Sequence, residues 1–170
     1  MTGLNQDPVL TASALVSQDG RQSPAALAIA RGAGRLLLAL GFASLPEMVL
    51  PNGRRADLIA VSAAGEIWIV EVKSSIEDFR ADQKWPDYRD FSDRLLFAVA
   101  PDFPAEILPD GTGIVIADRY GGDIVRPAPE HRLSAARRKA MILRFARLGA
   151  LRQQAMLDPD LKIEPGGWQP

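Results

Sequence analysis

The sequence predicts an α/β fold in which a mixed central sheet is flanked by helices. Apolar residues recur at helical spacing near the start of the chain and again near its end. Between these regions, short β-rich segments are separated by turns, and a helical segment precedes a strongly apolar strand. The 170 residues, 47% hydrophobic and 24% charged, are enough for one domain with a buried core.

The first helix is expected to begin at Ser23 and to stop at Gly41. Ser23 suits the N-cap and Pro24 suits the first helical position, while glycine is the residue that most often ends a helix. The apolar side of this helix repeats at helical spacing through Leu27, Ala30, Gly34, Leu37 and Leu38.

Three strands are expected to follow as an antiparallel meander. The segments 47–50 and 56–61 are joined by Pro51-Asn52-Gly53-Arg54-Arg55, and Asn-Gly between such runs is the strongest short hairpin signal. A turn over residues 62–66 leads into 67–73, whose sequence IWIVEVK is nearly continuous in β-forming residues. We therefore expect this third strand to be central in the sheet.

The second half of the chain should alternate helices and strands. Ser75 and Asp78 resemble a capping box, which predicts a helix over 75–84 that Pro86 breaks or redirects. Further strands are expected at 94–100, 114–117 and 123–126, and a long basic amphipathic helix at 134–157. The expected core order is therefore α, three β, α, β.

The same pattern divides the chain into three parts. Residues 1–22 are polar, mixed and aperiodic, so we interpret them as a flexible N-terminal arm. Residues 23–157 are expected to form the single folded domain, and residues 158–170 a C-terminal tail rich in proline and glycine.

Composition restricts the chemistry. The chain has no cysteine and one histidine, His131, which excludes disulfides and nearly excludes a structural zinc site. Any bound metal should be a hard cation held by oxygen, such as Mg²⁺, Mn²⁺ or Ca²⁺. No apolar run approaches the roughly 20 residues of a membrane span, and the start of the chain does not look like a signal peptide. We expect a cytoplasmic protein with no membrane partner.

Three residues of the meander point to a catalytic centre. Glu71 and Lys73 are two positions apart on one strand, so their side chains project from the same face. Asp57 lies on the preceding strand, and a tight meander can place it directly beside Glu71. Two carboxylates and a lysine are costly to bury in apolar strands without a partner. A divalent cation held by Asp57, Glu71 and the Val72 carbonyl would supply one, and it would activate water and stabilise negative charge on a phosphate.

These residues carry a family resemblance. Arg55-Ala56-Asp57-Leu58, a turn and then Trp68-Ile69-Val70-Glu71-Val72-Lys73 resemble the PD-(D/E)-x-K signature of restriction-endonuclease-like nucleases. The wider stretch NGRRADLIAV…IWIVEVKSS…DFRADQKWPDYRDFSDRLLFAVAPD resembles the MmcB family of bacterial DNA-repair-associated proteins, over roughly residues 24–127.

The resemblance implies a restriction-endonuclease-like fold with an αβββαβ core and a repair nuclease using Mg²⁺ or Mn²⁺. It implies metal ligation by Asp57 and Glu71, with Lys73 as the catalytic lysine. Two departures stand out. Ala56 replaces the usual proline, and the first helix carries Arg31 and Arg35 where many such nucleases have an acidic ligand. Glu47, on the first strand, is the candidate replacement for that ligand.

Other residues are candidates for accessory roles. The usual interpretation of Asp78, Asp82 and Lys84 is a charged, solvated helix face. Alternatively, that helix runs past the metal, and Lys84 or Tyr88 contacts a phosphate. Trp85 and Tyr88 could stack on unpaired bases, although such residues more often cap a core.

Several arginines are candidates for DNA binding. Arg54 and Arg55 flank a turn near the expected site and could grip phosphate, or could be ordinary exposed turn residues, and Arg31 and Arg35 lie one turn apart on the first helix. Between residues 131 and 155 there are seven basic residues and no acid, in a chain whose net charge is −1. That helix could follow a DNA backbone or simply be a solvated face.

The function expected from the sequence is DNA phosphodiester hydrolysis in a repair setting, in the bacterial cytosol with the nucleoid. The first alternative is a weak or inactive nuclease-like module that binds DNA or a repair or translesion-synthesis protein. The second is an enzyme that uses the same carboxylates on RNA or a nucleotide. A dinucleotide-dependent enzyme is disfavoured because the chain has no glycine-rich phosphate loop.

Overall fold

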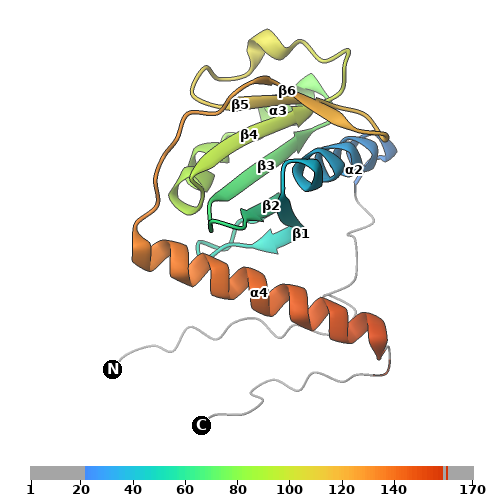
Figure 1. Ribbon diagram of the computed structural model, residues 1–170. Helices are drawn as coiled ribbons and strands as arrows, with labels where there is room; N and C mark the ends of the chain where they lie inside the picture. The colour runs from blue at the N-terminus through green and yellow to red at the C-terminus, as the bar shows by residue number, and fades with distance from the viewer. Residues whose placement is uncertain (1–21, 159, 161–170) are drawn as a thin grey trace.

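The computed structural model describes residues 22–158 and residue 160, which form a six-stranded sheet with helices packed against it (Figure 1). The elements are α2 (Pro24–Ala39), β1 (Phe42–Val49), β2 (Arg55–Ser62), β3 (Ile67–Lys73), α3 (Ile76–Ala81), the 3-10 helix η1 (Trp85–Phe91), β4 (Arg94–Val99), the 3-10 helix η2 (Ala105–Ile107), β5 (Gly113–Ala117), β6 (Gly122–Arg126) and α4 (Ala135–Leu157). The predicted order of α, three β, α, β is confirmed. The predicted arm and tail lie almost wholly outside the described residues.

The sheet is mixed, as predicted. The six strands lie side by side in chain order, from β1 at one edge to β6 at the other. β1, β2 and β3 form the antiparallel meander, β3, β4 and β5 are parallel, and β6 is antiparallel to β5. β3 is therefore an internal strand between β2 and β4, which is the central position expected from its apolar sequence.

Two predicted boundaries are wrong. β1 begins at Phe42 rather than at residue 47, and it includes Pro46. β1 is an edge strand, and proline is tolerated there because one side of the strand needs no ladder hydrogen bond. The helix predicted over 75–84 ends at Ala81, and Pro86 lies in the first turn of η1, where its fixed φ is compatible with a helical start.

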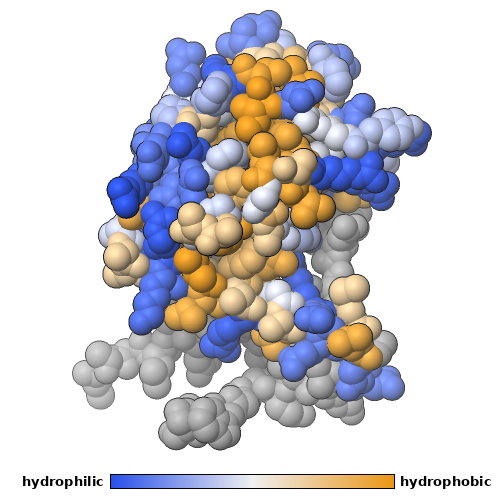
Figure 2. All heavy atoms as spheres, in the orientation of Figure 1, coloured by the Kyte–Doolittle hydropathy of each residue, from blue (hydrophilic) through white to orange (hydrophobic). Residues whose placement is uncertain are grey.

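The two faces of the sheet have separate cores. On one face α2 packs through Ile29, Ala33 and Leu37. On the other face α4 and η1 pack on a cluster that includes Ile69 and Tyr88. In the orientation of Figure 1, apolar side chains gather along the middle of the molecule with hydrophilic ones on either side (Figure 2).

The position of α2 depends on a close approach to the β5–β6 turn. A Cβ on Gly32 would lie 1.9 Å from the Asp118 carbonyl oxygen, so only glycine fits. One helical turn later, Arg35 Nη1 donates to the carbonyls of Arg119 and Tyr120, at 3.1 Å each. These contacts with backbone carbonyls hold α2 against the β5–β6 turn.

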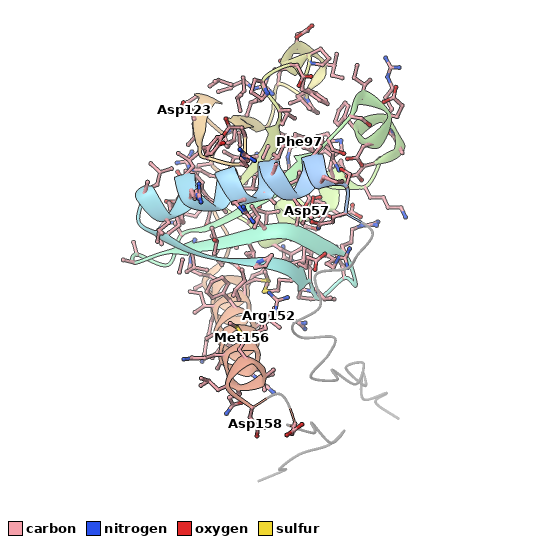
Figure 3. All side chains as sticks on the ribbon, turned by 90° about the vertical axis from the view of Figure 1, so that its right-hand side faces the viewer. Asp57, Phe97, Asp123, Arg152, Met156 and Asp158 are labelled. Atoms are coloured by element: carbon pink, nitrogen blue, oxygen red, sulfur yellow. The ribbon has the colours of Figure 1, made fainter. Side chains whose placement is uncertain are left out.

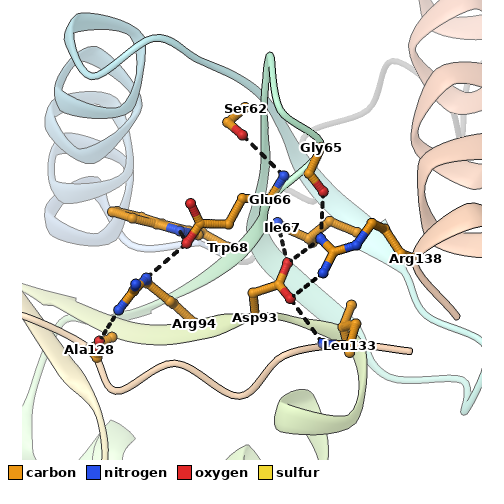
Figure 4. A network of polar contacts seen from close by, with 10 residues as sticks. All are labelled: Ser62, Gly65, Glu66, Ile67, Trp68, Asp93, Arg94, Ala128, Leu133 and Arg138. Atoms are coloured by element: carbon orange, nitrogen blue, oxygen red, sulfur yellow. Dashed lines mark hydrogen bonds and ion pairs between the residues drawn. The ribbon is translucent and has the colours of Figure 1, made fainter. Parts of the chain in front are cut away.

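A buried carboxylate fixes the start of α4 to the opposite face. Asp93, 1% exposed, accepts hydrogen bonds from the amides of Ile67 at 2.8 Å and Leu133 at 3.0 Å (Figure 4). Arg138 donates to both of its oxygens, at 2.6 and 2.7 Å, and to the Gly65 carbonyl at 2.7 Å. This network joins β3, β4 and α4 at the end of the sheet where β3 begins. From there α4 runs along the edge strand β1 (Figure 1), and Arg152, near the end of the helix, still donates to the Pro46 and Glu47 carbonyls.

In the described part of the chain, no helix is both long enough and apolar enough to cross a membrane.

Candidate functional site

The candidate site lies where β2 and β3 stop pairing through their backbones. Leu58 with Val70 is the last pair of the ladder, and the same register places Asp57 opposite Glu71. Beyond this pair, backbone amides donate to side-chain carboxylates instead of to the opposite strand's carbonyls. The Asp57 amide donates to Glu71 Oε1 at 3.1 Å, and the Val72 amide donates to Asp57 Oδ2 at 2.8 Å. The structure therefore brings the two carboxylates together at the end of these strands, and Figure 3 marks Asp57 there.

Both carboxyl groups lie in surroundings that disfavour their charged forms. Glu71 is only 2% exposed. Burial, followed by the neighbouring charge of Asp57, raises the pKa of Glu71 well above its ordinary value. Burial also raises the pKa of Asp57, against the opposing effects of the Val72 amide and the Lys73 ammonium. A positive charge placed between such groups would favour their ionised forms.

Lys73 is held by a carboxylate from outside the sheet. Lys73 is 5% exposed, and its Nζ lies 2.6 Å from Asp82 Oδ2. Burial lowers the pKa of Lys73, but the hydrogen bond to Asp82 and the charges of Glu71, Asp82 and Asp57 together outweigh it, so the pKa is raised. Burial raises the pKa of Asp82, but the hydrogen bond and charge of Lys73, the Lys84 amide and the charge of Arg54 together lower it by more. Lys73 is therefore an ammonium at neutral pH.

Asp82 is available to Lys73 because α3 ends one residue before it. Asp82 is the C-cap of that helix, and its Oδ1 accepts from the Lys84 amide at 3.0 Å. Asp82 was predicted only as a possible accessory residue. Its pairing with Lys73 was missed, because a helix continuing to Lys84 would have directed Asp82 differently.

Tyr88 closes the site from η1. It is 7% exposed, and its hydroxyl donates to the Arg55 carbonyl at 3.1 Å. Burial, and then the charges of Glu71 and Asp57, raise the pKa of Tyr88. Trp85 packs edge-on to Phe97, with ring centroids 5.8 Å apart, so it contributes to the core as the more common interpretation expects.

Two carboxylates and one carbonyl are the oxygens that could hold a cation. Among the described residues, no group of three or more His, Cys, Asp or Glu side chains is arranged to hold a metal. Mg²⁺, however, is commonly bound by one or two carboxylates while it keeps several waters. Asp57 Oδ1 accepts no hydrogen bond from the described residues, which leaves it able to bind. With the Val72 carbonyl as a third oxygen, the chemistry of this set fits Mg²⁺ or Mn²⁺.

Of the remaining accessory candidates, Asp78 lies near this centre and has a partner of its own. Asp78 is close enough for its charge to raise the pKa of Asp57, and its Oδ2 accepts from the Ser74 amide at 3.1 Å. Lys84 is exposed.

Glu47 lies opposite Asp57 in the β1–β2 register but is directed elsewhere. It has a positive φ of 51°, which is uncommon for a residue other than glycine. Its Oε1 accepts from Gln22 at 3.2 Å and lies 3.6 Å from Arg55 Nη2. Glu47, the replacement for the missing helix ligand expected from the sequence, is therefore paired with Gln22 and Arg55.

The arginine candidates fall into two groups. Arg54 and Arg55 are near the site: Arg54 pairs with Asp87 at 2.7 Å, and Arg55 faces Glu47. Arg31 and Arg35 belong to α2, which packs on Val70 and Val72. Because side chains alternate along β3, α2 covers the opposite face from Glu71 and Lys73.

Comparisons with known proteins agree on one family. A family model described as DNA repair protein MmcB-like matches residues 13–160. Among solved structures, the chain is similar to a protein of unknown function from Silicibacter pomeroyi, at 46% identity and a TM-score of 0.79, over 82% of this chain and 95% of that one. No curated protein matches the chain. Because the family model spans most of the chain, the chain belongs to the MmcB-like family of DNA repair proteins.

Proposed function

We propose that this protein is a Mg²⁺-dependent DNA nuclease of the PD-(D/E)-x-K type, acting in DNA repair. The observation that supports this most is the meeting of Asp57, Glu71 and Lys73 at the end of two adjacent strands. Both carboxyl pKa values are raised there, and the lysine beside them is an ammonium. A buried group of this kind is costly unless a cation and an anionic substrate complete it.

Each residue has a distinct role in the proposal. Asp57 and Glu71 would hold the cation through their carboxylate oxygens. When bound, Mg²⁺ supplies an activated water and stabilises negative charge on the phosphate. The Lys73 ammonium adds a second positive charge where charge develops during in-line attack. Asp82 positions Lys73 and keeps it protonated.

The family supports DNA as the substrate. Proteins of the matched family are described as DNA repair proteins. The site lies close to Arg54 and Arg55, which would attract a phosphate backbone. We place this activity with the chromosome in the bacterial cytosol.

A cleavage assay tests the proposal. Full-length protein is incubated with labelled single-stranded, gapped and duplex DNA, with Mg²⁺ or Mn²⁺, at protein excess over DNA. The Lys73→Ala variant should cut at least about 100-fold more slowly, as expected for the loss of a charge-stabilising group. The matched control is Lys139→Ala, which removes an exposed lysine from α4. Equal rates for Lys73→Ala and Lys139→Ala would exclude the role assigned to Lys73.

The second candidate function is a nuclease-like module that binds DNA or a repair or translesion-synthesis protein without cutting. Two observations favour it. α2 has no acidic residue, and the described residues contain no site of three acidic or histidine ligands. Titration with Mn²⁺ separates the two candidates. A nuclease should lose Mn²⁺ binding in Asp57→Asn, whereas a non-catalytic module should bind DNA but little Mn²⁺ in the native form.

A further inference from the structure

A second cationic feature lies on the same face of the sheet, at the opposite end of β3 from Lys73. A pocket of about 520 Å³ opens where η1 meets the start of α4. Three arginines line it, Arg89 from η1, Arg132 from the segment before α4 and Arg137 from the first turn of α4, together with one acid, Asp90. The lining therefore has three positive charges and one negative, a net charge of +2.

The arginines of this pocket have capacity for a ligand. Arg132 is exposed and makes no hydrogen bond or ion pair with any described residue. Arg137 Nη1 donates to the Asp90 carbonyl at 2.9 Å and lies 3.6 Å from the Asp90 carboxylate, but both side chains are about half exposed or more, and exposed pairs are weak. Arg89 donates through Nη2 to the Gly111 carbonyl at 2.8 Å, while its Nε is buried with no acceptor among the described residues.

The backbone adds to this positive character. Ser134 is the N-cap of α4, a helix of 23 residues with no acid in its first turn. The amides at such an end carry a partial positive charge and favour anions. His131, another lining residue, adds an imidazole N–H as a donor. Guanidinium groups with backbone donors around one pocket suit a phosphate group.

The pocket has a fixed relation to the candidate catalytic site. The amides of His131 and Leu133 both bond to Asp93, whose own amide donates to the Ile67 carbonyl at the start of β3. Lys73 is at the other end of this strand. Because a strand rises about 3.3 Å per residue, Lys73 lies about 20 Å from Ile67. At about 3.4 Å per nucleotide, this is about six nucleotides of B-form DNA.

We propose that this pocket binds a backbone phosphate of the DNA substrate, about six nucleotides from the phosphate at Asp57 and Glu71. The inference rests on the proposed function for its choice of substrate. The pocket supplies affinity and direction, and it holds the strand over the outer side of η1, which covers the face of the sheet that carries Glu71 and Lys73. Phosphate contacts of this kind fix the register of a nucleic acid without reading its sequence.

Salt-dependent DNA binding tests the proposal. Affinity of the full-length protein for a labelled duplex with a single-stranded tail is measured by fluorescence anisotropy over a series of KCl concentrations. EDTA is present so that no cleavage occurs. Arg132→Ala should reduce the slope of log affinity against log salt by about one, as expected for one lost phosphate contact. Arg132→Lys should keep most of the slope, because the charge remains.

The control is Arg147→Ala, which removes an exposed arginine further along α4. Its slope should equal that of the wild type. If Arg132→Ala behaves like the wild type, or if Arg147→Ala loses as much slope, the pocket is not a phosphate site.

The two proposals fail in different ways. If the wild type never cuts DNA with Mg²⁺ or Mn²⁺ but the slope depends on Arg132, the nuclease proposal is wrong and the phosphate site stands. If the wild type cuts DNA and Arg132→Ala binds with an unchanged slope, the phosphate site is wrong and the nuclease proposal stands.

Discussion

Replacing Asp93 with asparagine should destabilise the fold severely. Asparagine has nearly the same shape, but one of its two terminal atoms is an amide nitrogen that cannot accept a hydrogen bond. Each Asp93 oxygen accepts from one backbone amide and from Arg138, so either orientation of asparagine leaves two donors without an acceptor. The buried end of the Asp93–Arg138 ion pair also loses its charge.

The size of the effect follows from these contacts. Leaving a buried donor unsatisfied costs about 1–3 kcal/mol, and breaking a buried ion pair by removing one partner costs about 3–5 kcal/mol. Because these costs overlap, we expect a loss of about 3–5 kcal/mol in the free energy of unfolding. That is a large share of the roughly 5–15 kcal/mol typical of a whole domain.

The prediction includes a pH dependence. Burial raises the pKa of Asp93, but the bonds from Arg138 and from the Leu133 and Ile67 amides outweigh it and lower the pKa below 3.8. A carboxyl group with a lowered pKa in the folded state contributes stability above its unfolded pKa. The contribution is lost as pH falls through the folded value. The stability gap between wild type and Asp93→Asn should therefore be complete at pH 6 and should narrow as pH falls below about 4.

Urea unfolding followed by tryptophan fluorescence measures this gap. The control is Asp90→Asn, whose side chain is 73% exposed and 3.6 Å from Arg137, and which should change stability by less than about 1 kcal/mol. If Asp93→Asn is no less stable than Asp90→Asn, or if its gap to the wild type is unchanged at low pH, the network does not act as described.

Two further variants test the helix packing and the lysine. Gly32→Ala should lower the free energy of unfolding by about 1–3 kcal/mol or more, because the alanine Cβ would clash with the Asp118 carbonyl. Thermal unfolding measures this loss, and a variant as stable as the wild type would contradict the packing of α2. Asp82→Asn should slow DNA cleavage by about 10–100-fold, as expected for a residue that orients another. Because the pKa of Lys73 falls without Asp82, the high-pH limb of the rate profile should also move to lower pH. An unchanged pH profile would show that Asp82 does not act through Lys73.

The core of the site was predictable because it depends on local patterns. The Asn52-Gly53 turn and the apolar sequence of β3 predict the meander, and the period of two along a strand then places Glu71 and Lys73 on one face. Asp57 follows as the neighbour of Glu71 once the register is set. The structure has these features as expected.

The parts that were missed depend on contacts distant in sequence or on an exact helix end. Asp93 and Arg138 are 45 positions apart, and nothing in the local sequence links them. Asp82 reaches Lys73 only because α3 ends at Ala81. The direction of Glu47 depends on its positive φ, which the residues around Pro46 do not reveal.

The central claim is that the carboxylates of Asp57 and Glu71 share one divalent cation. A crystal of the full-length protein soaked in Mn²⁺, measured at the manganese absorption edge, tests this claim directly. The account predicts an anomalous peak within bonding distance of both carboxylates, absent in Asp57→Asn. A soaked wild-type crystal with no peak there, or with manganese bound only elsewhere, would contradict it.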